Sequence, residues 1–167
     1  MTVDIQPLGD RNDLEWCAQT MASSEPWITL GRDHEACLRE LDNSSKERYI
    51  VRADGARAGV LILDTNAAVF GGYIQSICLA ADARRRGIGS RVIAWAEERI
   101  FRDSPNVFMC VSSFNPDAQR LYARLGYEPV GVLKQFVVDE HDELLLRKTC
   151  GSWQAFRAGR TARSKMP

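Results

Sequence analysis

An apolar segment that runs into a loop of glycines and arginines, and from there directly into a helix, constrains the fold of this chain more than any other feature. Ile77–Leu79 ends a strand-like pattern, and Arg84–Gly89 supplies three arginines and two glycines before an amphipathic pattern begins. The start of a helix offers unpaired backbone N–H groups and a partial positive charge, which together bind phosphate. Glycine lets a ligand approach the backbone. The segment predicts a strand–loop–helix unit with an anion site, although an exposed basic connection explains the glycine pattern alone equally well.

Two other nucleotide-binding motifs do not fit this loop. A dinucleotide-binding fingerprint needs a third glycine three residues after Gly89, and Val92 occupies that position. A P-loop needs a Gly-Lys-Ser or Gly-Lys-Thr step, which the sequence lacks. We therefore expect neither a dinucleotide fold nor a P-loop.

A second motif marks a short helix that begins after residue 115. Asn115 suits the N-cap of a helix, Pro116 its first position and Gly126 the position just past its end. Helical spacing places four residues on the inward face: Ala118, Leu121, Tyr122 and Leu125. Taken alone, Asn115 would be only a cap and Tyr122 only a core aromatic.

Apolar periodicity gives the order of the elements. Alternating or continuous apolar residues predict strands, and apolar residues spaced three and four apart predict helices. The first half reads as a strand, two helices and three consecutive strands: Thr2–Leu8, Leu14–Met21, Asp33–Leu41, Arg48–Ala53, Gly59–Leu63 and Phe70–Leu79. The second half alternates helix and strand and ends on two strands: Gly89–Phe101, Val107–Val111, Pro116–Leu125, Tyr127–Val138 and Glu143–Lys148. This order predicts an α/β domain.

The composition is that of one ordinary domain. The chain has 167 residues, of which 45% are apolar, enough for a core without a metal or a disulfide framework. Its 22 basic and 22 acidic residues balance, which argues against nucleic acid or a membrane as a partner of the whole surface. No run of about 18 apolar residues predicts a membrane span, and Met1–Asp4 begins unlike a signal peptide. We expect a cytoplasmic location.

The cysteines and histidines predict no metal site. The 5 cysteines are scattered without a Cys-x-x-Cys pair, and the 2 histidines, His34 and His141, lie far apart in the sequence. A zinc site in a chain of this kind is usually built from clustered ligands. We therefore expect reduced thiols that pack as small apolar groups.

Taken together, the two motifs resemble those of the GCN5-related N-acetyltransferase (GNAT) family. Arg-x-x-Gly-x-Gly at Arg84–Gly89 is followed by Asn-x-x-Ala-x-x-Leu-Tyr-x-x-x-Gly-Tyr at Asn115–Tyr127, in the strand–helix–strand–helix context that this family uses. The resemblance covers roughly Val3–Thr149. It implies an α/β fold whose mixed sheet has splayed central strands flanked by helices. It also implies an N-acetyltransferase domain at residues 1–149 and a basic C-terminal tail at residues 150–167.

The resemblance assigns roles to the motif residues. In that family the loop wraps the pyrophosphate of acetyl-CoA, the preceding strand hydrogen-bonds the pantetheine arm, and the thioester lies where two strands splay. The cofactor-binding residues implied are Ile77, Cys78, Leu79, Arg84, Arg85, Arg86, Gly87, Ile88, Gly89, Ser90 and Asn115. Tyr122 would face the sulfur and assist the departure of the thiolate. Acetyl-CoA is then a cosubstrate, and no metal is implied.

The general base is where the sequence departs from part of the family. Members that act on protein N-termini often carry a glutamate five residues before the Asn, and here Cys110 stands at that position. A buried thiol indicates packing rather than a base, so no base is assigned. A water relay could use any of three residues, Tyr73, Gln75 and Glu25. Because a phenol (pKa about 10) is a weaker acid than a thiol (about 8.5), we expect Tyr122 to donate a strengthening hydrogen bond rather than its whole proton.

These implications give a hypothesis for function. We expect transfer of an acetyl group from acetyl-CoA to a primary amine of a small molecule, by direct attack. One alternative is acetylation of a protein N-terminus or lysine, and another is a CoA-binding sensor without catalysis. The acceptor should meet Ser24–Gly31 and Val138–Glu143, whose acidic residues suit a cationic amine but also suit plain solvated loops. The acceptor's identity and the oligomeric state stay open, a homodimer included.

Overall fold

The computed structural model describes residues 1–67 and 71–164. The first half holds β1 (Val3–Pro7), α1 (Arg11–Ala22), α2 (His34–Leu41), β2 (Glu47–Ala53), β3 (Ala56–Asp64) and β4 (Tyr73–Leu79). A short 3₁₀ turn, η1 (Ala81–Ala83), leads into the second half, which holds α3 (Ile88–Ile100), β5 (Asn106–Ser112), α4 (Pro116–Arg124), β6 (Glu128–Leu133), β7 (Glu143–Thr149) and α5 (Trp153–Ser164).

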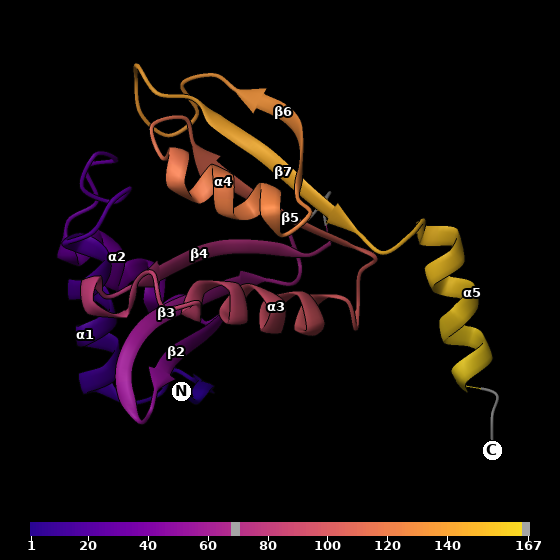
Figure 1. Ribbon diagram of the computed structural model, residues 1–167, viewed down its shortest axis with the longest axis horizontal. Helices are drawn as coiled ribbons and strands as arrows, with labels where there is room; N and C mark the ends of the chain where they lie inside the picture. Colours follow the sequence, from indigo (N-terminus) through magenta and orange to yellow (C-terminus); the bar gives the residue numbers. More distant parts are fainter. Residues whose placement is uncertain (68–70, 165–167) are drawn as a thin grey trace.

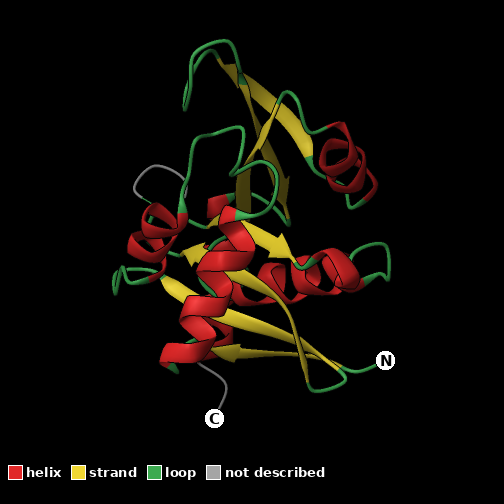
Figure 2. Ribbon diagram, turned by 90° about the vertical axis from the view of Figure 1, so that its left-hand side faces the viewer, coloured by secondary structure: helices red, strands yellow, loops and turns green. Residues whose placement is uncertain are grey.

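The strands form one mixed sheet in the order β1-β2-β3-β4-β5-β7-β6 (Figure 1). Neighbouring strands are antiparallel, except for the parallel pair β4 and β5. In the described part of the chain, the pairing of β4 with β5 is confined to Tyr73 and Phe108. Beyond that point the two strands part, so that β5, β6, β7 and α4 lie on one side of the split and β1–β4 on the other (Figure 1, Figure 2), while α3 packs against both parts in one core cluster. The predicted α/β fold with splayed central strands is confirmed.

Helices cover both faces of the sheet because β3 is apolar on both faces. Val60 and Ile62 pack with α1 and α2, whereas Leu61 and Leu63 pack with α3. All four side chains are fully buried. Each such side chain contributes about 1.5–3 kcal/mol of burial free energy, which fixes the sheet between the two helical layers. The continuous apolar pattern at residues 60–63 therefore reports a strand covered on both faces.

Two predicted strands differ from the structure at their ends. The strand expected at Tyr127–Val138 ends at Leu133, because Gln135 takes a left-handed φ of 48° and its backbone N–H donates to Asp142 instead of to a strand. The strand expected from Phe70 begins at Tyr73, and Phe70 itself lies outside the described residues.

The basic tail expected at residues 150–167 contains helix α5, which extends away from the sheet (Figure 1). The guanidinium of Arg160 fixes it to the end of α3 by donating to the backbone carbonyl of Arg102, 3.0 Å away. Lys165, part of the predicted tail, lies outside the described residues. No helix in the described ranges is long and apolar enough to cross a membrane. The cytoplasmic location stays a prediction.

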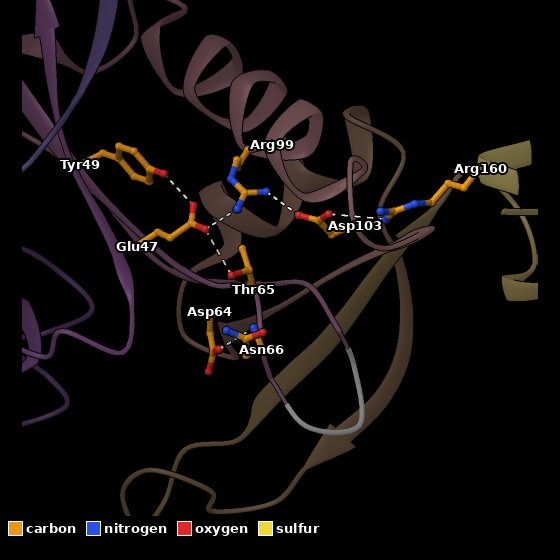
Figure 3. Close-up of polar contacts among 8 residues, drawn as sticks. All are labelled: Glu47, Tyr49, Asp64, Thr65, Asn66, Arg99, Asp103 and Arg160. Atoms are coloured by element: carbon orange, nitrogen blue, oxygen red, sulfur yellow. Dashed lines mark hydrogen bonds and ion pairs between the residues drawn. The ribbon is translucent and has the colours of Figure 1, made fainter. Parts of the chain in front are cut away.

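A chain of charged side chains links β2, α3 and α5 (Figure 3). Glu47 accepts hydrogen bonds from the Tyr49 hydroxyl and from Arg99, which also donates to Asp103 at 2.8 Å. Arg160 of α5 lies 3.5 Å from the other Asp103 oxygen. Hydrogen bonding from Arg99, with a further contribution from Arg160, lowers the pKa of Asp103 below its usual value.

We expect these ion pairs to make the free energy of unfolding fall at acid pH. Because the pKa of Asp103 is lower in the folded protein, its contribution is present above the unfolded value of about 3.9 and is lost as the pH falls below it. The melting temperature of the wild type should therefore fall more steeply below about pH 4 than that of Asp103→Asn. Thermal melts of both proteins from pH 6 to about pH 3 test this, and parallel curves would contradict it.

Candidate active site

A cavity of about 630 Å³ lies where β4 and β5 part. Its walls come from the loop after α1, from α2, from both parted strands, from α4 and from the hairpin that joins β6 to β7. The β4 backbone beyond Tyr73 pairs with β3 on one side only, since β5 has moved away. An extended ligand can therefore add to the free edge of β4 as a strand would.

Helix α3 begins beside the end of β4, outside the residues that line the cavity, and the first N–H groups of its backbone are unused in the described part of the chain. Gly87 is its N-cap with a left-handed φ of 76°, and it has no side chain to cap the helix. The first helical bond runs from the Arg91 N–H to the Gly87 carbonyl. Within the described residues, the N–H groups of Ile88–Ser90 have no hydrogen-bond partner. Such a helix start attracts anions.

Gly89 ties the helix start to the strand and to α4. A Cβ at this position would lie 3.6 Å from a methyl of Leu79, at the end of β4, and 3.8 Å from a methyl of Leu121, which precedes Tyr122 on α4. These are ordinary contact distances. The end of β4, the start of α3 and the middle of α4 therefore meet, as the two predicted motifs require.

The three arginines of the loop have different surroundings. Arg84 is used within the protein, because its Nε donates to the Leu79 carbonyl and its Nη2 to the Ser24 hydroxyl, each at 2.9 Å. Arg85 and Arg86 are exposed next to the helix start. Arg84 thus braces the loop against β4, and the other two guanidinium groups are accessible to an anion.

Asn115 and Tyr122 of α4 both line the cavity. The Asn115 side chain also caps α4, since its Oδ1 accepts the Ala118 N–H at 3.2 Å. Tyr122 packs edge to face on Tyr127, with ring centroids 6.1 Å apart. Burial raises the pKa of Tyr122 to about 12. Its hydroxyl has no hydrogen-bond partner among the described residues, so it is available to a ligand.

An irregularity in β4 builds one wall of the cavity. The register with β3 shifts between Ile62 and Leu63, which leaves Gln75 as an extra residue in β4. Gln75 and Ser76 consequently both reach Glu40 of α2, with hydrogen bonds of 3.0 Å and 2.7 Å to the same carboxylate oxygen. Arg32 lies 3.7 Å from its second oxygen. Glu40 is thus a well-compensated carboxylate.

A second carboxylate, Glu143, occupies the opposite wall. It begins β7 opposite Ser112, whose hydroxyl donates to it at 2.6 Å, and its residue is only 5% exposed. Burial raises the pKa of Glu143 above its usual value. The Cys110 thiol and the Tyr73 phenol line the same cavity, and burial raises the pKa of both groups.

Comparison with models of protein families shows which family the chain belongs to. The model of the Acetyltransferase (GNAT) family matches residues 11–127, more than half of the chain. The chain belongs to the GNAT acetyltransferase family. The resemblance expected from the two motifs is confirmed, and acetyl-CoA is the cosubstrate of this N-acetyltransferase. A search of the curated proteins finds no match.

Solved structures share the fold of this acetyltransferase. A proposed GNAT acetyltransferase from Desulfovibrio desulfuricans is 16% identical, with a TM-score of 0.73 over 90% of this chain and 100% of that one. The ribosomal-protein-S18-alanine N-acetyltransferase from Escherichia coli is 15% identical, with a TM-score of 0.71 over 90% and 96%. The spermidine N-acetyltransferase from Vibrio cholerae, solved with CoA and spermine, is 18% identical, with a TM-score of 0.67 over 88% and 95%.

Three of the predicted site residues line the cavity, whereas those of the Arg84–Ser90 loop do not. Ile77 of β4, Asn115 and Tyr122 line the cavity, and the helix start at Gly87–Ser90 lies at the end of β4. The side chain of Cys78 is buried in the core on the other side, so only its backbone is available to a ligand. The described residues contain no cluster of His, Cys, Asp or Glu suited to a metal ion.

Sequence reasoning missed part of the acceptor side. Glu25, Trp27 and Leu30 of the predicted loop do line the cavity, but Asp139 and Glu140 of the predicted hairpin are exposed outside it. Glu143, the last residue of that hairpin segment, is the one that enters the cavity. Glu40 was not predicted at all. The sequence does hold a signal for Glu40: it is an acidic residue on the side of α2 that carries the buried residues Cys37 and Leu41.

Proposed function

We propose that this acetyltransferase acts on a primary amine of a small cationic molecule. The supporting observation is the acceptor side of the cavity, which carries carboxylates from three separate segments, Glu25, Glu40 and Glu143. Two guanidinium groups also line it, but Arg39 is ion-paired to exposed Glu35 and Arg32 faces Glu40. Buried Trp27 of the loop and the exposed side chains of Phe136 and Val137, from the hairpin, also line the cavity. Carboxylates that line such a cavity favour an ammonium ligand.

We place acetyl-CoA along the free edge of β4. The pyrophosphate would lie at the N–H groups of Ile88–Ser90, with Arg85 and Arg86 beside it. The pantetheine arm would follow the backbone of Ile77–Leu79 toward Asn115. Arg84 holds the loop in position through its bond to the Leu79 carbonyl. The thioester would then lie beside Tyr122, which lines the cavity and whose hydroxyl has no partner in the described ranges.

The chain's own groups account for the transfer step. Acetyl-CoA supplies an activated acetyl group, and the cleft holds it against the acceptor, so that the attack becomes effectively intramolecular. The amine attacks the thioester carbon directly. As negative charge develops on sulfur, the hydrogen bond from the Tyr122 hydroxyl strengthens. A tyrosine whose pKa is raised to about 12 stays protonated throughout, as a hydrogen-bond donor to thiolate must.

Acetylation of a protein N-terminus or lysine is the second candidate. The fold is shared with a ribosomal-protein-S18-alanine N-acetyltransferase, but also with enzymes named for spermidine and aminoglycosides. Cys110 stands where N-terminal acetyltransferases often carry a glutamate, and its thiol pKa is raised, so it does not supply a base. An assay that measures release of the CoA thiol with small amines and, in parallel, with short peptides as acceptors distinguishes the two candidates.

Gly89→Val should weaken CoA binding by about 10- to 100-fold, the loss expected when one or two backbone hydrogen bonds to an anion are blocked. The folded protein should tolerate the change, because the new Cβ meets only Leu79 and Leu121 at ordinary contact distances. Calorimetric titration with CoA measures the effect, and the melting temperature checks folding. Wild-type affinity in a folded variant would show that the pyrophosphate lies elsewhere.

The affinity of the wild type for CoA should also fall as the salt concentration rises, because salt screens the attraction between the phosphates and the arginines.

A further inference from the structure

Glu143 is a buried carboxylate whose charge has no partner in the part of the chain that the structure describes. It is 5% exposed, and its one hydrogen bond comes from the neutral Ser112 hydroxyl at 2.6 Å. No Lys, Arg or His of that part lies within ion-pair distance of it. Burying an unpaired carboxylate is unfavourable, so proteins rarely keep one without a use. Because Glu143 lines the cavity, a ligand can supply the missing positive charge.

The surroundings of Glu143 keep it separate from the other charges of the cleft. The groups that face the same cavity are Cys110 and Ser112 of β5, Tyr73 of β4, Tyr122 of α4, Glu25 and Arg32 of the loop, and Arg39 and Glu40 of α2. The Cys110 thiol and the Tyr73 phenol both have raised pKa values, so they are neutral near pH 7. The β6 residue paired with Glu143 is the apolar Leu133. None of these neighbours neutralises Glu143.

Glu40 shows the contrast within the same cavity. Three donors surround its carboxylate, those of Gln75, Ser76 and Arg32. The negative charge of a carboxylate surrounded in that way is compensated within the protein. Among the described residues Glu143 has one neutral donor, so its negative charge is left for a ligand to compensate.

We infer that Glu143 binds the ammonium form of the acceptor and takes its proton before the amine attacks. The inference rests on the proposed function, since it needs an amine acceptor in this cavity. It also gives the enzyme a proton acceptor on β7 rather than at the Cys110 position. Position supports this role: Glu143 is on the strand that pairs with β5, and β5 is the wall of the splayed gap opposite β4.

The proton and electron balance of the step is complete. One N–H bond of the ammonium breaks, an O–H bond forms on Glu143, and the nitrogen lone pair becomes free. That lone pair forms the N–C bond to the acetyl carbon while the C–S bond breaks. The second proton leaves the nitrogen as the amide forms, and one of the two protons ends on the CoA thiol with help from Tyr122. The other is released to solvent when Glu143 ionises again.

Glu143→Gln is the direct test. The amide oxygen can still accept from Ser112, so packing should survive, whereas the group can no longer take a proton. We expect kcat/KM for the amine at pH 7 to fall by about 10²- to 10³-fold, within the usual range for a general base. Glu128→Gln is the matched control, because it removes one exposed carboxylate from neighbouring β6, outside the cavity. CoA affinity and melting temperature should stay close to wild type in both variants.

The pH dependence distinguishes proton transfer from a structural role. Between the pKa of Glu143 and that of the amine, the wild-type rate should be level. The Glu143→Gln enzyme instead depends on acceptor that is already neutral, and this fraction rises about tenfold per pH unit. The defect should therefore shrink as the pH rises. A defect of constant size at all pH values, or none at any, would overturn the inference.

Ser112→Ala provides a second test should Glu143→Gln fail to fold. The Ser112 hydroxyl lowers the pKa of Glu143, so its removal should move the acid limb of the pH–rate profile to higher pH. An unmoved limb would contradict the assignment. Failure of the inference is distinguishable from failure of the proposed function: in the first case wild-type enzyme acetylates small amines but neither variant changes the profile. In the second case wild-type enzyme acetylates no small amine.

Discussion

Tyr122→Phe is expected to lower turnover by about 10²- to 10⁴-fold, the usual loss for a positioned proton donor. The change removes one hydroxyl and keeps the ring, which packs on Tyr127. That loss corresponds to about 3–5 kcal/mol at the transition state, more than the roughly 1 kcal/mol of an ordinary hydrogen bond. The loss exceeds that of an ordinary hydrogen bond because the hydrogen bond from the Tyr122 hydroxyl strengthens as negative charge moves onto the sulfur. Ground-state binding of CoA should change little.

The measurement for Tyr122→Phe is steady-state release of the CoA thiol with an amine acceptor. Titration with CoA and thermal melting of both proteins serve as controls, since they report binding and packing. Unchanged turnover would make Tyr122 a core aromatic that happens to line the cavity. A loss of melting temperature as large as the loss of activity would point to packing as well.

Gly59→Ala should be the most destabilising single substitution predicted for the fold. A Cβ on Gly59 would overlap the backbone carbonyl oxygen of Cys78, on the neighbouring strand, and would lie 3.2 Å from the Leu79 Cα. Backbone cannot move aside as a flexible side chain can, so β3 and β4 would separate at this point. We expect a loss of about 3 kcal/mol in the free energy of unfolding, or roughly 6–12 °C in melting temperature.

Gly131→Ala is the matched control for Gly59→Ala. Gly131 is also a strand glycine, in β6, but apart from its own chain neighbours no described residue has an atom within 4 Å of the position that its Cβ would take. The two substitutions therefore differ in whether backbone stands in the way. Chemical denaturation of both variants measures the difference. Equal free energies of unfolding for the two variants would contradict the prediction, because they would show that β3 and β4 can separate at Gly59 without loss of stability.

The elements and motifs of this fold follow from local sequence, because their signals are local. Asp10 and Asp33 cap α1 and α2 with side-chain oxygens, and the helices begin at the next residue. Asn115 caps α4, and Pro116 starts it, as the sequence predicts. The apolar run at Val60–Leu63 predicts a strand covered on both faces, which the two helical layers confirm. Spacing and capping chemistry were sufficient for these features.

The acceptor side depends on contacts that no local pattern reports. Glu40 and Gln75 are 35 residues apart and meet because the β4 register shifts at Gln75. Glu143 and Ser112 are 31 residues apart and meet through strand pairing. Arg84 reads as an anion ligand in the sequence, and no local pattern reports the two partners that its side chain has within the protein, the Leu79 carbonyl and the Ser24 hydroxyl. The hydrogen-bond and ion-pair partners of a carboxylate decide whether it keeps its negative charge or takes a proton. Those partners come from segments that are far apart in the sequence and meet only in the folded protein.

The most direct test of acetyl transfer to a small amine uses wild-type protein, acetyl-CoA and two acceptor panels, small mono- and diamines on one side and short peptides on the other. Thiol release and mass spectrometry of the acceptors are followed together. We expect one acetyl group on a small amine for each CoA thiol released, at a rate well above that of acetyl-CoA hydrolysis. Transfer to peptides alone, or tight CoA binding without transfer to any acceptor, would contradict it.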